Sequence, residues 1–270
     1  MLFRRSRPEL APFVEHLWYV DEPLPPGRDR TLPTGAAQLV VNLAADRLNW
    51  YDGADLAERR GVGGAGLCAP LARPIGVDTA DQACTAGVVF RPGGLAAFVD
   101  LPVCALTDHV TALADVWGPD GGSVREWVLS ARTPGERLDV LERLLLARLR
   151  ASGGPRRDPA VAYAVDALDR GAAVGAVADR LGASASTLRR RFHAAVGLSP
   201  KQFARVRRLQ RVLRTVTASG VPAPDWAEVA ASHGYFDQAH LVNDFRALTG
   251  LTPGRYLPRS AAEHNHVPLG

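Results

Sequence analysis

The chain has 270 residues, of which 47% are hydrophobic and 22% are charged. That length is enough for two domains, each with its own core. No run of about 18 apolar residues occurs, which excludes a membrane-spanning helix, and the first residues lack the apolar stretch of a secretory signal. We therefore expect a cytoplasmic protein with no membrane partner.

Positive charge is concentrated in the second half of the chain. Residues 155–270 carry 16 basic and 9 acidic side chains, whereas residues 1–154 carry 16 and 19. Lys201 is the only lysine, so nearly all of the positive charge is arginine. Clustering of this kind predicts a polyanionic partner such as a nucleic acid, although a basic domain without such a partner would have a similar composition.

The first ninety residues alternate short β-rich runs with glycine and proline. The clearest runs, at 13–20, 38–43 and 85–90, predict strands, with weaker candidates between them. From Gly93 the apolar period becomes helical, and residues 95–98 begin a short helix. The expected fold class is α+β: a β-rich N-terminal domain with a helical tail, followed by an all-α domain.

A stripe of leucines marks the end of the first half. Helical spacing places them on one face of a long helix, which either packs on its own domain or forms a dimer contact. This stripe is one reason to expect a homodimer. It consists of Leu138, Leu141, Leu144, Leu145 and Leu149.

The three cysteines, Cys68, Cys84 and Cys104, match no metal-ligand or disulfide spacing. We interpret them as ordinary buried thiols, the alternative being a thiol sensor with a lowered thiolate pKa. No metal or cofactor is expected. The segment 151–159 combines glycine, proline and charge, which is typical of a linker between domains.

The second half contains an internal repeat. Each unit has a short helix with a Val-Ala pair, a glycine at a sharp turn, a longer helix with leucine and phenylalanine four residues apart, and a Gly-Leu-Ser/Thr-Pro stop, which is the plan of a helix-turn-helix. The first unit supplies Val177, Ala178, Gly182, Leu188, Phe192, Gly197, Leu198, Pro200 and Phe203, and the second Val229, Ala230, Gly234, Leu241, Phe245, Gly250, Leu251, Pro253 and Tyr256.

Helical geometry predicts the outward face of each longer helix. In the first unit this face carries Ser186, Arg189, Arg190 and His193, with Arg191 at its border; in the second it carries Ala239, Val242, Asn243 and Arg246. The arginine run would be a solvated surface in an arbitrary protein. On the second helix of a helix-turn-helix it instead predicts contact with the major groove, where arginine pairs with guanine.

Residues 159–256 resemble the AraC/XylS DNA-binding domain, through the motif Gly234-Tyr235-Phe236-Asp237-Gln238, the run from Phe245 to Pro253, and Tyr256. The resemblance implies seven helices, with a helix around 206–217 holding the units apart so that both recognition helices enter successive major grooves. It also implies base reading by Ser186, Arg189 and Arg190 in the first unit, and by Gln238, His240 and Asn243 in the second. Asn243 stands where relatives commonly have arginine, which puts guanine reading there in doubt. The full expected DNA-binding set is Ser186, Thr187, Arg189, Arg190, Arg191, His193, Gln238, His240, Asn243 and Arg246.

The first 150 residues more faintly resemble the regulatory regions fused to such domains, at Leu17-Trp18, at 32–35 and at 90–94. The resemblance implies effector sensing or dimerisation by residues 1–152, DNA binding by 158–258 and a tail at 259–270. Candidate effector contacts are aromatic or basic, with core packing or a strand-end salt bridge as the alternative. They are Trp18, Trp50, Tyr51, Phe90 and Arg91.

Other function classes fit less well. The motifs of serine hydrolases, P-loop enzymes, zinc proteases and dinucleotide-binding enzymes are missing, and a DNA-repair alkyl acceptor would need clustered cysteines. An architectural DNA-binding protein without a sensor remains open. The sequence therefore predicts a transcription regulator whose partners are duplex DNA, a second copy, a small-molecule effector and, for an activator, RNA polymerase.

Overall fold

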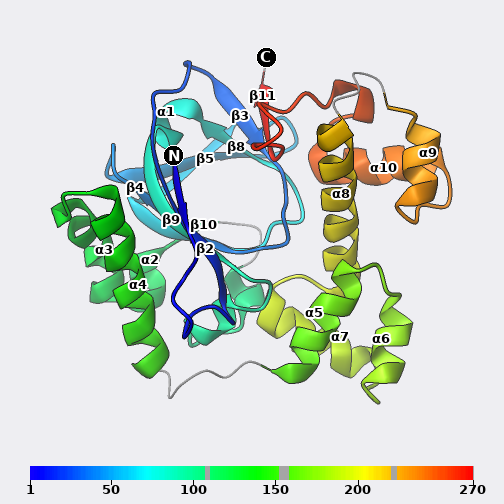
Figure 1. Ribbon diagram of the computed structural model, residues 1–270, viewed down its shortest axis with the longest axis horizontal. Helices are drawn as coiled ribbons and strands as arrows, with labels where there is room; N and C mark the ends of the chain where they lie inside the picture. The colour runs from blue at the N-terminus through cyan, green and yellow to red at the C-terminus, as the bar shows by residue number, and fades with distance from the viewer. Residues whose placement is uncertain (107–109, 152–157, 220–223, 270) are drawn as a thin grey trace.

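The computed structural model describes residues 1–106, 110–151, 158–219 and 224–269. Two antiparallel sheets with flanking helices make up one side of the molecule, and the helices after residue 158 make up the other (Figure 1). The expected α+β class is confirmed. Residues 152–157, on which the expected linker and domain boundary fall, lie outside the described residues, so the boundary stays a prediction.

The larger sheet contains the three strands predicted from the apolar pattern. Val88 faces Leu17 on one neighbouring strand and Leu39 on the other, and all three side chains are fully buried. These strands are central because their apolar side chains form a continuous row across the sheet. The strand order is β1 (Leu2–Arg4), β2 (Val14–Asp21), β9 (Cys84–Phe90), β4 (Gln38–Asn42), β7 (Ala65–Cys68) and β10 (Val110–Ala112).

The second sheet is more polar, and the sequence pattern did not identify its strands. Its strand β3 (Arg28–Thr31) has the sequence Arg-Asp-Arg-Thr, which lacks any apolar alternation. Such a strand forms because its neighbours pair with its backbone, and not because of its own side chains. The strand order is β11 (His266–Leu269), β3, β8 (Ile75–Asp78), β5 (Arg47–Asp52) and β6 (Glu58–Gly63).

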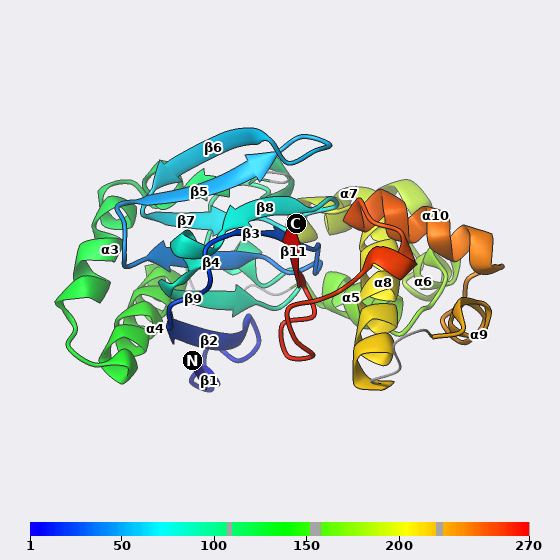
Figure 2. The same cartoon turned by 90° about the horizontal axis from the view of Figure 1, so that it is seen from above.

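The leucine stripe lies on α4 (Pro134–Ala151), which with α3 (Pro119–Ser130) covers the side of the sheets remote from the C-terminal helices (Figures 1 and 2). Leu138, Leu141, Leu145 and Leu149 are buried in the core of their own domain, and Leu144 packs against it. Of the two alternatives, packing on its own domain is the one observed. The expected homodimer therefore loses the support of this stripe. The remaining short helices here are α1 (Thr79–Gln82), η1 (Leu95–Ala97), η2 (Val103–Leu106) and α2 (Leu113–Trp117).

The C-terminal helices follow the repeat. The longest, α8, has 20 residues and joins the two units. Its buried face, including Phe203, Val206, Leu209 and Leu213, contributes to the core that both units share. The elements are α5 (Pro159–Asp169), α6 (Val174–Arg180), α7 (Ala185–Val196), α8 (Pro200–Ser219), α9 (Trp226–Ser232), α10 (Gln238–Thr249) and η3 (Pro253–Arg255).

The two turn glycines have the same backbone conformation. Gly182 has φ of +58° and Gly234 has φ of +72°, and a Cβ at either position would meet no atom within 4 Å. Glycine is therefore required by the left-handed backbone and not by crowding between the helices.

The two halves meet in two places: along β3 and the loop that follows it, and where α7 packs against η1 and η2. The tail returns to add β11 to the edge of β3, pairing Pro268 with Asp29 (Figure 2). Leu32 and Val267 enter the core of the C-terminal helices. Arg30 donates a 2.9 Å hydrogen bond to the carbonyl of Thr249, the last residue of α10. The segment 259–270, expected only as a tail, thus contributes a strand to the N-terminal sheet.

None of the helices in the described part of the chain is both long and apolar enough to cross a membrane.

The burial of the stripe gives a stability prediction. Leu141→Ala removes a side chain that is 1% exposed, so we expect it to lower the free energy of unfolding by about 2–5 kcal/mol. Leu144→Ala, on the same helix but only partly buried, should cost clearly less. Denaturant unfolding of both variants measures this. Equal costs, or dissociation of an oligomer by Leu141→Ala alone, would contradict the packing described here.

Candidate DNA-binding interface

The first unit is ordered by a cap and an aromatic pair. Ser184 begins α7 and its hydroxyl accepts a hydrogen bond from the backbone N–H of Thr187, while Gly197 ends the helix in the left-handed conformation. Phe192 is fully buried and its ring meets that of Phe203 edge-on, with centroids 5.4 Å apart. These contacts fix the rotation of α7 about its axis.

That rotation leaves a polar face open to solvent. Ser186, Arg189, Arg190 and His193 are all exposed, as the periodicity predicts. Thr187 is half-buried, and its hydroxyl accepts a hydrogen bond from Ser184. Its backbone and hydroxyl are thus engaged in the cap.

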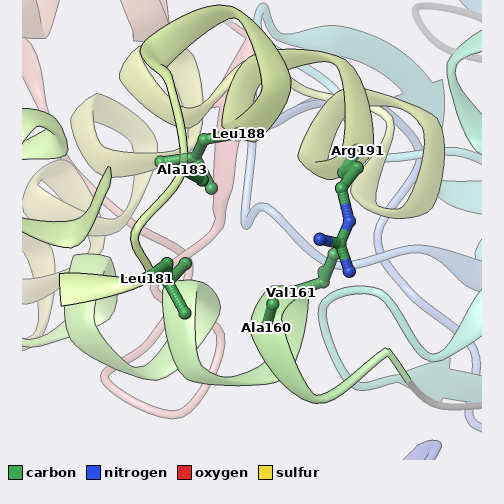
Figure 3. A pocket seen from close by; sticks show the side chains of 6 residues that line it. All are labelled: Ala160, Val161, Leu181, Ala183, Leu188 and Arg191. Carbon is green, nitrogen blue, oxygen red and sulfur yellow. The ribbon is translucent and has the colours of Figure 1, made fainter. Parts of the chain in front are cut away.

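Arg191 has a partner inside the protein. Its guanidinium donates to both carboxylate oxygens of Asp158, at 2.7 and 2.9 Å for one nitrogen, and Asp158 also caps α5 by accepting from Ala160. Figure 3 shows Arg191 beside a small pocket whose other walls, including Val161 and Leu188, are apolar. The side chain therefore joins α7 to α5, whereas Arg189 and Arg190 form no ion pair with any described residue.

The Asp158 carboxylate is stabilised by this arrangement. Partial burial would raise its pKa, but the hydrogen bonds from Arg191 and from the backbone N–H groups of Val161 and Ala160 outweigh burial, so the pKa of Asp158 lies below its ordinary value. The charged form is thus favoured in the folded protein.

The second unit repeats the design with different residues. Asp237 caps α10 by accepting from the backbone N–H of His240 at 2.7 Å, and Asp225 caps α9. Phe245 is buried against the rings of Trp226 and Tyr256, with centroids 6.1 and 5.7 Å away. The core side of α10 is therefore as firmly defined as that of α7.

The exposed face of α10 is less basic. Gln238, His240, Asn243 and Arg246 are exposed, together with Ala239, while Val242 is half-buried. The Nδ1 of His240 accepts a 3.3 Å hydrogen bond from the backbone N–H of Phe236. A neutral His240 therefore carries its proton on Nε2, which makes that nitrogen a donor.

Two features of this region were not predicted. Phe236, in the turn before α10, is 92% exposed, which is exceptional for a phenylalanine. The arginines of α8 were assigned no role, although three of them, Arg205, Arg208 and Arg211, line a groove between the two units. The dense arginine run at 205–214 was the signal in the sequence that could have identified this groove.

The five candidate effector residues lie in separate surroundings. Phe90 is fully buried beside Phe98, and Trp50 packs with Leu71 and Ile75 in a small cluster. Trp18 covers Gly87, where a Cβ would lie 2.6 Å from the indole.

Polar partners hold the remaining two candidates. Tyr51 donates to Asp78 at 2.8 Å and lies under the Arg28 guanidinium, while Arg91 is exposed and donates to the carbonyl of Ala11. None of the five candidate effector residues lines the pocket beside Arg191 or the groove along α8.

The cysteines are half-buried and free. Burial raises the pKa of Cys68 to about 12, and burial together with Asp21 raises the pKa of Cys84. A thiolate sensor requires the opposite shift. For these two the environment matches ordinary thiols; Cys104 is also only partly exposed.

Two family models match different parts of the chain. A family model described as a helix-turn-helix domain matches residues 177–259, and one described as a domain of unknown function (DUF6597) matches residues 4–112. The first match includes both α7 and α10. A search of curated proteins found no significant match.

Solved structures of ToxT from Vibrio cholerae are similar in layout. An apo variant has 10% sequence identity and a TM-score of 0.45, covering 94% of this chain and 98% of that chain. A structure at 1.65 Å resolution has 8% identity and a TM-score of 0.44, covering 89% and 96%. Wild-type ToxT bound to an unsaturated fatty acid has 8% identity and a TM-score of 0.43, covering 94% and 96%.

The Asp158 contacts give a pH-dependent prediction. Asp158→Ala removes the cap of α5 and the partner of Arg191, so we expect it to lower the free energy of unfolding by about 1 kcal/mol at neutral pH. Because the folded pKa is depressed, this contribution is present above the unfolded pKa of about 3.9 and is lost as pH falls through the lower folded value.

The matched control is Asp166→Ala, an exposed acid on the same helix. Denaturant unfolding between neutral and acidic pH should show the gap between wild type and Asp158→Ala closing, with the control unchanged. A gap that stays constant with pH would show that the carboxylate charge plays no part.

Proposed function

Since residues 177–259 are an AraC-type helix-turn-helix domain, the DNA-binding part of a transcription regulator, we propose that the protein reads two successive major grooves with α7 and α10 under the control of its N-terminal domain. The observation that carries this proposal is the pair of capped helices, each with leucine and phenylalanine buried on one face and polar side chains exposed on the other. The spacing supports it. A helix of 20 residues such as α8 spans about 30 Å, close to the roughly 34 Å between successive major grooves on one face of DNA.

The two recognition helices divide the work of reading bases. Arg189 and Arg190 of α7 are each able to donate two hydrogen bonds to guanine, for roughly 1–3 kcal/mol of discrimination, and Ser186 adds a donor near the start of the helix. On α10, Ala239 offers only apolar contact and Asn243 suits adenine. Gln238, His240 and Arg246 hold backbone or flanking edges.

The position of the remaining two candidates supports narrower roles. We assign Arg191 to the bond between α7 and α5, because Asp158 already neutralises it. Thr187 acts through its backbone N–H in the cap. Neither is needed for base reading, which leaves eight side chains in the proposed contact set.

Control through the N-terminal domain is supported by the contacts of its strand β3 and of the loop that follows β3. Arg30 bonds to the end of α10, and the carbonyls of Pro33 and Thr34 accept from Gln210 and Arg207 of α8. If a small molecule displaced β3 on binding, these hydrogen bonds would therefore transmit the displacement to the linking helix α8 and to the second unit. The proposal includes a homodimer on DNA and, for an activator, contact with RNA polymerase.

A metabolite library screened by thermal unfolding tests for the effector. A ligand that binds only the native state raises the unfolding midpoint, and the rise grows with the logarithm of ligand concentration above the Kd. A positive result whose shift is lost in Trp50→Ala or Tyr51→Ala would place the ligand at the second sheet. A library that shifts nothing would favour an architectural DNA-binding protein instead.

The first DNA prediction concerns salt. Phosphate neutralisation by the basic C-terminal half releases counterions, so affinity for duplex DNA should fall steeply between roughly 50 and 200 mM salt, by about a thousandfold if about six phosphates are contacted. Fluorescence anisotropy with the full chain measures this. An affinity that does not change with salt contradicts DNA binding by this surface.

The second DNA prediction concerns how much α7 and α10 each contribute to base recognition. Arg190→Ala should abolish selective binding because it removes a guanine contact, whereas Asn243→Ala should relax one position at a cost of about 1 kcal/mol. Both variants are measured against single-base operator variants at one salt concentration. Greater damage from Asn243→Ala, or a strict G·C requirement beneath α10, would reverse the assigned roles while leaving the family unchanged.

A further inference from the structure

An open groove runs along α8 between the two helix-turn-helix units. It encloses about 1600 Å³ including its open mouth, and its walls come from the end of α5, the loop into α6, the first half of α8, the α9–α10 turn and the start of α10. In Figure 1, α8 bridges the two units, with α6 and α9 on the same side of it. The groove thus connects the units on the side away from the N-terminal domain. Its basic residues are Arg170, Lys201, Arg205, Arg208 and Arg211, with His233 and His240.

The groove carries a surplus of positive charge. Five lysine or arginine side chains line it against one carboxylate, that of Asp244. Asp244 is buried and bonds to Arg205 at 2.6 Å, so it neutralises only its own partner. The lining as a whole therefore attracts anions.

Arg208 and Arg211, which also line the groove, are held in place by backbone carbonyl groups, which are uncharged. Arg208 donates to the carbonyl of Gly234 at 2.8 Å and stacks 4.5 Å from the ring of Tyr235. Arg211 donates to the carbonyl of Asp169, whose carboxylate is bonded through both oxygens to Arg207. A carbonyl orients a guanidinium without cancelling its charge.

The last two cations are the most accessible. Arg170 at the end of α5 and Lys201 at the start of α8 are exposed, and neither forms an ion pair with a residue in the described ranges. They lie on separate elements that face the same groove, which suits a ligand with more than one negative charge.

We infer that this groove binds the phosphodiester backbone of DNA where it passes from one major groove to the next between α7 and α10. This inference rests on the proposed function. Two observations favour an extended backbone: the groove is open along its length, and its walls continue into the recognition surface through His240 in the first turn of α10 and into the first helix of the other unit through Ala172–Val174. The first helix of a helix-turn-helix is the one that crosses the backbone.

The test removes the two accessible charges together. Arg170→Gln with Lys201→Gln should make the negative slope of log affinity against log salt shallower by about 1.8, because each phosphate contact contributes about −0.9 to that slope. If the plots of log affinity against log salt for the wild type and the double variant meet near 1 M salt, the affinity of the variant at 0.1 M is lower than that of the wild type by about 60-fold. The probe is a duplex of about three helical turns, long enough for both units, with the full chain.

The matched control is Arg59→Gln with Arg143→Gln. These two arginines are exposed on β6 and α4 of the N-terminal half, so the net charge changes equally. A groove variant with the same slope as this control overturns the inference. Failure of the wild-type protein to bind the duplex at all overturns the proposed function instead.

Inorganic phosphate distinguishes the DNA backbone from a free anion as the ligand. We expect phosphate at millimolar concentration to change the unfolding midpoints of wild type and groove variant equally. A rise seen only in the wild type, together with unchanged DNA slopes, would identify a small-anion site and overturn the inference.

Discussion

The contact between β3 and the C-terminal helices is the constraint on which the rest of the molecule depends. The carbonyls at the end of a helix have no partner within it, and Arg30 of β3 supplies one for Thr249 of α10 while being only 8% exposed. Removing the Arg30 side chain would leave the buried carbonyl of Thr249 without this partner, which is costly. A side chain from a strand of the N-terminal domain thus caps the C-terminal end of the second recognition helix.

The same strand is itself completed by the C-terminal tail. Arg259 and His266 both approach the buried carboxylate of Asp29, and Asn265 accepts from Gln210 of α8 at 2.7 Å. The chain therefore leaves the helical units, pairs with the N-terminal sheet and contacts the linking helix again. Because each of these bonds involves a different element, movement of β3 would be felt at α8, at α10 and in the tail together.

Arginine serves three purposes in the helical units, and its surroundings determine which. Arg191 is neutralised by an aspartate and fixes one helix to another. Arg208 is oriented by a carbonyl and an aromatic ring but keeps its charge. Arg189 and Arg190 are exposed and remain available to a partner. Three consecutive arginines thus have two different roles, since adjacent residues on a helix point about 100° apart.

The amino-acid sequence alone determined the α+β class, the strands with alternating apolar residues, the two units and their buried and exposed faces. All of these follow from local periodicity, caps and glycines, which are encoded within a few residues of where they act. Tertiary structure decided the pairing of Asp29 with Pro268, the partner of Arg191, the burial of the leucine stripe and the separation of the candidate effector residues. These depend on contacts between distant segments, which no local pattern encodes, because a polar strand or an apolar stripe is compatible with several partners until the whole chain has folded.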